Sequence, residues 1–461
     1  MRMNGDRAEN IRIAYIGGGS RGWAWGLMND LVLEGQLSGE VRLYDIDFSA
    51  AYDNERIGNN ISQSDAAKSA WSFKAVEKLD DALEGADFVV ISILPGTFKE
   101  MESDVHEPEK YGIYQAVGDT TGPGGLVRAL RTIPMYREIA QAIQRVSPEA
   151  WVINYTNPMT LCTMTLYEVF PGIKAFGCCH EVFGTQELFV KLLKEFRGIE
   201  GAARSDIKVN VKGINHFTWI DEATYSGNSI LEVYGEFVEK YYEPGYEGPS
   251  RAEGESCFVS GQRVKMDLFK RYKTIAAAGD RHLAEFCPPW YLKNPETVLD
   301  WQFRLTPVSY RLKELEERIA KSQRLVKGEE KWELTRTGEE GVALMKALLG
   351  LQDLLTNMNL PNKGQLMGIP MGSVVETNAY VSRNSIVPLA AGKLPDQVNN
   401  LVLRHVHNQH AIMKAALEKD RELAFAAFVS DPLVNLSIDD AKALFEKMLQ
   451  NTKQYLPGWG L

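Results

Sequence analysis

Cysteine and long apolar runs are both scarce in this sequence. Five cysteines in 461 residues (Cys162, Cys178, Cys179, Cys257 and Cys287) are too few for a disulfide framework, which argues against a small disulfide-stabilised secreted fold. No apolar run approaches the roughly 18 residues of a membrane span, and the N-terminal residues lack the apolar core of a signal peptide. We therefore expect a cytoplasmic protein with reduced thiols and no membrane partner.

Positive charge is also in short supply. The chain carries 51 Lys and Arg against 61 Asp and Glu, a formal net charge of −10, and this gives no electrostatic footprint for nucleic acid. A small anionic substrate stays open, because local charge can oppose net charge. A hydrophobic share of 44% and a charged share of 24% are ordinary for a globular protein, and the length allows two or three domains.

A glycine pattern near the N-terminus is the feature around which the chain is organised. Residues 11–16 (Ile-Arg-Ile-Ala-Tyr-Ile) are typical of a buried strand, and they lead into Gly17, Gly19 and Gly22, which fit G-x-G-x-x-G. In this pattern Gly17 permits a tight turn, Gly19 lets a pyrophosphate approach the backbone, and Gly22 packs the next helix on the strand. The helix N-terminus, with Ser20 in the turn before it, offers N–H groups to the phosphates.

Asp45 indicates which dinucleotide would bind there. It follows a second predicted strand, residues 41–44, and lies 23 residues past Gly22. A carboxylate at this place accepts both ribose hydroxyls of NAD and repels the 2′-phosphate of NADP, so the sequence favours NAD. The alternative is a glycine turn in an α/β domain that holds no nucleotide.

Strands and helices alternate over about the first 180 residues. Besides the two strands above, strands are predicted at 71–75, 88–93, 151–154 and 175–177, and helices at 49–62 and 126–146. This order predicts an α/β fold, with a doubly wound parallel-sheet (Rossmann) domain over residues 8–200. Ligands of such sheets bind beyond the carboxyl ends of the strands, so the residues that follow each strand should converge on one edge.

From residue 201 to 461 the pattern changes to a mixed, helix-rich α+β domain. We assign substrate binding, metal binding and oligomerisation to it. Helices are predicted at 257–272, 309–325, 339–356, 396–418 and 437–451, strand-like pieces at 207–211 and 372–381, and an irregular loop at 240–256.

Two residues that follow predicted strands could hold a metal ion. Cys179 comes after the strand at 175–177, and His216 comes after the strand at 207–211. A thiolate and an imidazole are good ligands for a divalent transition metal, and two protein ligands leave positions for substrate oxygens. The spacing is no zinc signature, so a small buried cysteine and a hydrogen-bonded core histidine are the plainer interpretation.

Five further residues are candidates for chemistry in the cleft. His180 could transfer protons at neutral pH, or serve only the structure. Asp119 lies in a glycine-rich segment, which is either a substrate loop or a plain connector, and Asn154 ends a predicted strand. Asp280, in a segment that could equally be a charged loop, and Tyr272 are candidate bases.

Together these segments resemble glycoside hydrolase family 4, the NAD- and metal-dependent glycosidases. The motifs that carry the resemblance occur in family order over most of the chain: Gly17–Gly22, Asp119–Gly125, Asn154–Pro158, Gly177–Glu181, Gly213–His216 and Gly279–Phe286. Within the family, the wording Gly-Cys-Cys-His-Glu and Gly-Asp-Arg-His-Leu-Ala-Glu-Phe is most similar to the α-galacturonidase branch.

The resemblance implies where metal and sugar bind. Cys179 and His216 match the residues that hold Mn²⁺, and Asp119 and Asn154 match positions that contact substrate hydroxyls. A thiolate is an unusual ligand for Mn²⁺, so the identity of the metal rests on the resemblance.

The resemblance also implies an acid and a base. His180 occupies the place after the metal cysteine where some relatives carry a proposed general acid, and Asp280 matches a proposed base of one branch. Other branches use a tyrosine, for which Tyr272 is the candidate here. The implied reaction cleaves an α-galacturonide by C3 oxidation, C2 deprotonation, elimination and re-reduction, with NAD regenerated.

One departure from the family bears on the substrate. Members that act on phosphorylated sugars carry a cation after the third strand, whereas residues 93–96 here are Ile-Leu-Pro-Gly. A 6-phosphate is therefore disfavoured, and for a C6 carboxylate Lys99, Arg281 and Arg304 are the candidate cations. The alternatives are an α-galactosidase, α-glucosidase or glucuronidase of the same family, a lactate/malate-type dehydrogenase, or a non-catalytic NAD sensor. A homo-oligomer, dimer or tetramer, is expected on family grounds.

Overall fold

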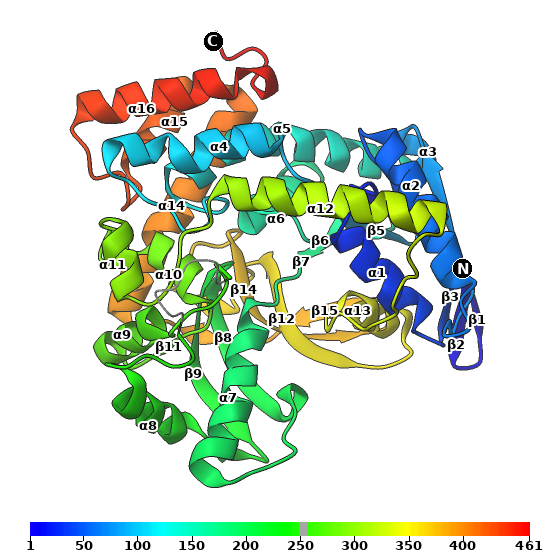
Figure 1. The fold of residues 1–461 in the computed structure, drawn as a ribbon, viewed down its shortest axis with the longest axis horizontal. Helices are drawn as coiled ribbons and strands as arrows, with labels where there is room; N and C mark the ends of the chain where they lie inside the picture. Colours follow the sequence, from blue (N-terminus) through cyan, green and yellow to red (C-terminus); the bar gives the residue numbers. More distant parts are fainter. Residues whose placement is uncertain (249–255) are drawn as a thin grey trace.

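The alternating strands and helices build one ten-stranded sheet that runs through the molecule (Figure 1). The structure is a computed structural model that describes residues 1–248 and 256–461. Six parallel strands form the main part of the sheet, in the spatial order β4 (Trp71–Val76), β3 (Leu37–Tyr44), β2 (Arg7–Ile16), β5 (Phe88–Ile91), β6 (Trp151–Asn154) and β7 (Lys174–Gly177). The short strand β1 (Arg2–Asn4) pairs antiparallel with β2. This arrangement confirms the predicted doubly wound α/β fold.

Three strands from the second half of the chain complete the sheet. They are antiparallel and follow β7 in the order β12 (Leu354–Pro361), β14 (Val374–Ser382) and β15 (Ser385–Pro388). The sheet thus joins segments on both sides of residue 200, and the division into domains at that point stays a prediction.

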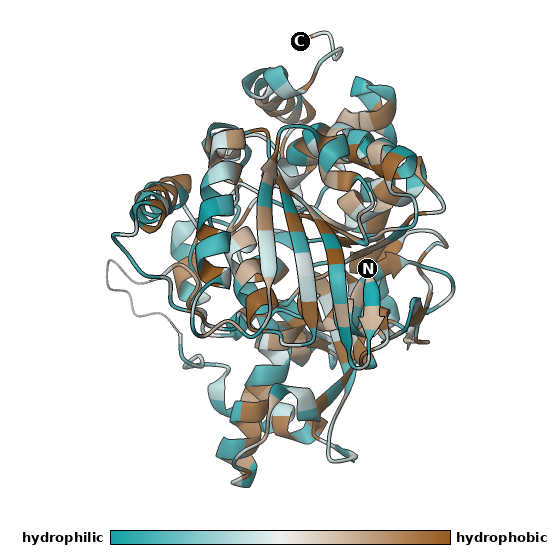
Figure 2. Ribbon diagram, turned by 90° about the vertical axis from the view of Figure 1, so that its right-hand side faces the viewer, coloured by the Kyte–Doolittle hydropathy of each residue, from teal (hydrophilic) through white to brown (hydrophobic). Residues whose placement is uncertain are grey.

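Burial on both faces explains why the central strands are continuously apolar. All four residues of β5 are buried; Val90 packs in one apolar cluster and Val89 in another, on opposite faces of the sheet. The helices that cover the two faces include α1 (Trp23–Val32), α2 (Phe48–Ser62), α3 (Leu79–Leu83), α5 (Gly122–Val146), α6 (Met159–Val169) and α13 (Gly341–Leu349). Bands of hydrophilic and hydrophobic residues alternate along the strands that face the viewer in Figure 2, as expected for a sheet edge in contact with solvent.

A second, four-stranded sheet supports the other side of the site. It consists of β8 (Ile207–Ile214), β9 (Phe217–Tyr225), β10 (Asn228–Ser229) and β11 (Ile275–Ala276). The helices around it are α7 (Glu181–Arg197), α8 (Leu231–Tyr241), α9 (Arg263–Tyr272) and α10 (Asp280–Phe286). In Figure 1 these elements lie below the large sheet, away from the C-terminus.

Six further helices belong to the described residues, and three of them, α4, α15 and α16, lie near the C-terminus in Figure 1. They are α4 (Phe98–His106), α11 (Pro295–Asp300), α12 (Val308–Lys327), α14 (Asp396–Glu418), α15 (Arg421–Val429) and α16 (Ile438–Asn451). Figure 1 shows α16 beside α4, where Asn451 Nδ2 donates to Ser103 Oγ at 2.9 Å. Of the helices in residues 1–248 and 256–461, none is long and apolar enough to cross a bilayer.

The structure corrects the helix predicted at 339–356. Only Gly341–Leu349 is helical, because Gly350 ends the helix in a left-handed conformation with φ 78°. The residues from Leu354 onward pair with β14 and form β12 instead. Their apolar pattern fits both a helix and a buried strand, and tertiary pairing decides between them.

Other differences concern element ends. The helix predicted at 257–272 begins at Arg263, and helices α7 and α8 were not predicted. Of the loop predicted at 240–256, residues 249–255 lie outside the described residues. The helices predicted at 309–325, 396–418 and 437–451 agree with α12, α14 and α16 within two residues at each end.

Candidate active site

The glycine turn lies at the carboxyl ends of β2 and β3. Gly17 has φ 96°, and a Cβ there would collide with the Ser92 carbonyl oxygen, so only glycine fits. The Gly17 N–H donates to Tyr44 O at 2.9 Å, and the Ser20 N–H donates back to Gly17 O at 3.0 Å. Gly22 then caps α1. The turn has the strand–turn–helix context that a dinucleotide site requires.

Asp45 is fixed against this turn. Its Oδ2 accepts from the Gly19 N–H and its Oδ1 from the Asp47 N–H, each at 2.9 Å. Burial raises the pKa of Asp45 above its usual value. The structure therefore brings the predicted cofactor residues together, with the carboxylate held by the backbone.

A cavity of about 340 Å³ adjoins the turn; Tyr15, Gly22, Trp23, Tyr155, Arg318 and Glu339 are among the residues that line it. The Trp23 ring stacks on Tyr155 with centroids 5.3 Å apart and on His180 with centroids 6.3 Å apart. His180 Nδ1 lies 3.0 Å from Glu339 Oε1, and this hydrogen bond raises the pKa of His180. His180 thus lies on the glycine-turn side of the site and its side chain is about half exposed.

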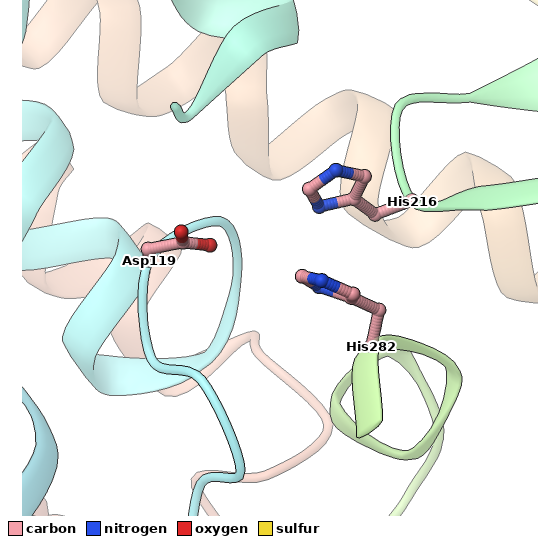
Figure 3. A group of neighbouring side chains, drawn as sticks. All are labelled: Asp119, His216 and His282. Atoms are coloured by element: carbon pink, nitrogen blue, oxygen red, sulfur yellow. The ribbon is translucent and has the colours of Figure 1, made fainter. Parts of the chain in front are cut away.

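Three side chains from distant parts of the chain form a cluster suited to a metal ion (Figure 3). Asp119 precedes α5, His216 lies in the turn between β8 and β9, and His282 lies in the first turn of α10. One ligand atom of each lies within 4.8 Å of those of the other two. Two imidazoles and a carboxylate are ligands that divalent transition metals accept.

The charge states of the cluster suit metal binding. Burial and the neighbouring His282 lower the pKa of His216 to about 3, so its imidazole is neutral at pH 7 and has a free electron pair. Burial alone would raise the pKa of Asp119, but Arg128 and the two histidines outweigh it and lower the pKa to about 2. Asp119 is therefore an anion.

The ring orientations are set by neighbours. His216 Nδ1 lies 3.1 Å from Thr120 Oγ1, while the buried Nδ1 of His282 has no hydrogen-bond partner in the part of the chain that the structure describes. His216 also has φ 139°, a strained conformation for a residue with a Cβ that costs on the order of 1–3 kcal/mol. An unsatisfied ring nitrogen and a strained backbone are both typical of a functional site.

Glu181, at the start of α7, supports the cluster from behind. Its Oε2 accepts from the Gly279 N–H at 2.7 Å, and its Oε1 lies 3.5 Å from His282 Nε2. Burial alone would raise the pKa of Glu181, but His282 and His216 outweigh it and lower the pKa to about 2. Glu181 thus holds α10 and its histidine in place.

Cys179 lies near the cluster without joining it. Its thiol lies beside Asn215, the residue before His216, and burial together with Glu376 raises its pKa well above the usual value. Within residues 1–248 and 256–461, the group of potential ligands around His216 contains Asp119 and not Cys179. Its role as a metal ligand stays a prediction.

The two candidate bases lie in other surroundings. Asp280 is 1% exposed, and its oxygens accept from the N–H groups of Val264 and Lys265, which begin α9. Burial raises the pKa of Asp280. Tyr272 packs edge-on against Trp219 with ring centroids 6.0 Å apart. The structure brings neither into the cluster, and which of them acts as base stays a prediction.

Asn154 and Asn157 lie at different places relative to the cluster, and the predicted contact of Asn154 with substrate stays a prediction. The side chain of Asn154 is fully buried, and among the described residues its hydrogen bonds are with Tyr136 and with the backbone of Thr156. Asn157 instead reaches the cluster, since its Nδ2 lies 3.4 Å from Asp119 Oδ2. Its buried Oδ1 has no partner among the described residues. The polar run after β6 was the available signal for Asn157.

With this geometry established, the comparisons with known proteins place the chain. The sequence profile described as "Family 4 glycosyl hydrolase" matches residues 12–195, and the profile of the C-terminal domain of this family matches residues 211–434. The chain belongs to glycoside hydrolase family 4. The resemblance seen in the motifs is confirmed.

Similar proteins cover the whole chain. It is 62% identical over 461 residues to an alpha-galacturonidase of Thermoanaerobacterium saccharolyticum, covering 100% of this chain and 99% of the relative. It is 52% identical to an alpha-galacturonidase of Bacillus subtilis, covering 96% and 97%. A 6-phospho-alpha-glucosidase from gut microorganisms, solved in complex with NAD and Mn²⁺, has the same fold with a TM-score of 0.81, 18% identity and coverage of 97% and 99%.

Proposed function

We propose that this protein is an NAD- and divalent-metal-dependent α-galacturonidase, with Mn²⁺ as the metal. The observation that carries the proposal is the Asp119–His216–His282 cluster. Asn157, in the turn after β6, contacts this cluster, and β6 is parallel to the strand that leads into the glycine turn. Full-length relatives described as alpha-galacturonidases, at 52–62% identity, support the sugar class.

The residues present fit both groups. Gly17, Gly19, Ser20, Gly22 and Asp45 would hold NAD, which accepts a hydride from the sugar and returns it. For the metal, the unsatisfied Nδ1 of His282 and the neutral imidazole of His216 can each provide an electron pair. Cys179, whose thiol lies beside Asn215, is the further candidate ligand. A bound divalent ion supplies positive charge that polarises the substrate hydroxyls.

The protein's own residues would then bind the sugar and move protons. Asp119 and the neighbouring Asn157 are placed to orient hydroxyls, with Asn154 fixing the turn that carries Asn157. His180, with its raised pKa, is the proposed acid for the departing glycosidic oxygen. Asp280 is the proposed base and Tyr272 the second choice.

The larger-scale properties are proposals of the same kind. We propose a nucleotide-binding domain up to about residue 200, followed by a domain for substrate, metal and oligomerisation, and a cytoplasmic homo-oligomer. The separate profile matches to residues 12–195 and 211–434 support the division. Light scattering of the purified chain would distinguish a dimer or tetramer from a monomer.

A substrate panel tests the function. With NAD⁺, Mn²⁺ and a thiol reductant present, hydrolysis of 4-nitrophenyl α-galacturonide should exceed that of the α-galactoside, the α-glucoside, the α-glucuronide and the 6-phosphates. Preference for one of the neutral glycosides would assign a different member of the family. Steady accumulation of NADH with a hydroxy acid would instead indicate a dehydrogenase.

A further inference from the structure

One buried cation beside the site has almost no partner of its own. Arg128 lies on α5, just after the loop that carries Asp119, and it is 5% exposed. The only hydrogen bond of its side chain within the described residues runs from Nε to the Asn157 carbonyl oxygen, at 3.2 Å. No carboxylate in residues 1–248 and 256–461 forms an ion pair with it at 4.0 Å or less.

The neighbouring arginine shows what a structural cation looks like here. Arg131, one turn further along α5, forms a buried ion pair with Asp104 and donates through Nε to Pro95 O at 2.9 Å. Because a buried charge is costly without an anion, Arg131 is compensated inside the protein. Arg128 has no such ion pair within the described residues, although the negative charge of Asp119 acts on it, so the N–H groups of its guanidinium can still donate to an anion supplied from outside.

The position of Arg128 relates it to the sugar. Its Nε donates to the backbone of Asn157, and the side chain of Asn157 reaches Asp119. The guanidinium therefore lies next to Asp119 and Asn157, the residues proposed to orient the sugar hydroxyls. A sugar whose hydroxyls contact Asp119 would bring another of its substituents toward Arg128.

Two of the other candidate cations lie in different surroundings. Arg281 donates to the Ala116 carbonyl and to Thr306, and its guanidinium lies 4.8 Å from the centre of the Phe258 ring. Lys99 lines a separate cavity of about 540 Å³ between α4 and the C-terminal residues. Within the described residues, neither forms a hydrogen bond or ion pair with Asn157 or Asp119.

We propose that Arg128 binds the C6 carboxylate of the uronate and so selects it over the neutral sugar. This inference rests on the proposed function and adds the residue that recognises the substrate class. A planar guanidinium can bind a carboxylate through two parallel hydrogen bonds, and a neutral C6 hydroxymethyl group leaves its buried charge uncompensated.

Substitution of Arg128 tests the proposal. Arg128→Gln should lower kcat/KM for 4-nitrophenyl α-galacturonide, relative to the α-galactoside, by roughly 100-fold or more, because a site built for a polar group rejects its absence strongly. Arg128→Lys keeps the positive charge but loses the paired N–H groups of the guanidinium, and it should give an intermediate ratio of kcat/KM for the two substrates. The matched control is Arg145→Gln on the same helix, where an exposed arginine pairs with Asp80; it should leave the ratio unchanged.

Each result decides the question. If Arg128→Gln slows both substrates equally, Arg128 serves the structure only and the proposal is overturned. If the wild type cleaves no galacturonide, the proposed function fails instead, which the wild-type assay reveals by itself. Should the variants not fold, a crystal structure of the wild type with NAD⁺ and galacturonate still decides: a carboxylate within about 3.2 Å of Arg128 supports the proposal, and one bound to Arg281 or Arg304 contradicts it.

Discussion

The imidazole rings of His216 and His282 lie with their centroids 4.1 Å apart, one in a hairpin turn and the other on α10 (Figure 3). Nothing in the local sequence pairs them, since their contact depends on the packing of the small sheet against α10. Two protonated rings at this distance would repel each other, and burial together with His282 keeps His216 neutral at pH 7. This pair, with Asp119, is the reason to place the metal here.

Removal of His282 should weaken metal binding more than any surface change. We expect His282→Ala to raise the Kd for Mn²⁺ by at least about 100-fold, because even residues that only orient ligands cost 10- to 100-fold. Titration calorimetry measures this directly. His407→Ala, at an exposed position, is the control and should bind as the wild type does. An unchanged Kd in His282→Ala would remove His282 from the metal site.

The glycine turn should tolerate no side chain at Gly17. Gly17→Ala places a Cβ against the Ser92 carbonyl at a positive φ, so the free energy of unfolding should fall by roughly 3 kcal/mol or more. Gly184, an exposed glycine within α7 with nothing within 4 Å of an added Cβ, is the matched site. Gly184→Ala should gain up to about 1 kcal/mol from helix propensity. Equal stability of the two variants in urea titrations would contradict this reading of the turn.

His180 as general acid predicts a dependence on the leaving group. An acid helps most when the departing oxygen is strongly basic, and such help is worth roughly 100-fold to 10,000-fold. His180→Ala should therefore slow methyl α-galacturonide far more than 4-nitrophenyl α-galacturonide, whose phenolate leaves without a proton. Steady-state rates on the two substrates measure the difference, and an equal loss on both would exclude His180 as the acid.

Glu285 should make stability depend on pH. Its Oε1 accepts from the N–H groups of Val117 and Gly118, beside Asp119, and burial raises its pKa to about 8 from its usual value of 4.5. The folded state therefore keeps a proton that the unfolded state releases above pH 4.5. The stabilisation is complete below that pH and is lost as the pH rises toward 8.

The variant Glu285→Gln isolates this effect, because glutamine keeps the accepting oxygen and does not titrate. Relative to the variant, the wild type should lose on the order of 4 kcal/mol of unfolding free energy between pH 5 and pH 8. Urea unfolding with a chelator present, at both pH values, measures the difference without interference from metal. Parallel pH profiles of the two proteins would show that Glu285 is already ionised in the folded state.

The parts of the site that the sequence predicted are those whose partners are close in the chain. The glycine turn and Asp45 follow adjacent strands, and their pairing is a property of a βαβ unit. His216 could be identified as a candidate for a similar reason, because it follows a strand that the apolar pattern predicts. The fold class was predictable because segments with the hydrophobic pattern of a strand alternate with segments that have the pattern of a helix. Tertiary contacts did not change these elements in the first half of the chain.

What the sequence did not predict depends on contacts between distant elements. His282 and Asn157 gain their place only when α10 and the turn after β6 meet Asp119. The sequence made Asp280 a candidate base, yet in the structure its carboxylate accepts a hydrogen bond from the first turn of α9. The first residues of β12 were predicted as the end of a helix, because its two leading leucines fit a helix as well as a buried strand.

Hydrolysis of 4-nitrophenyl α-galacturonide in D₂O, with NAD⁺ and Mn²⁺ present, tests most directly whether glycine turn, metal cluster and acid–base groups act on one sugar. Deprotonation at C2 exchanges that hydrogen with solvent, so the released galacturonate should carry deuterium at C2 while no NADH accumulates. Mass spectrometry and NMR locate the label, and absorbance at the NADH band follows the cofactor. Galacturonate that keeps its original hydrogen at C2 would contradict the redox-assisted elimination.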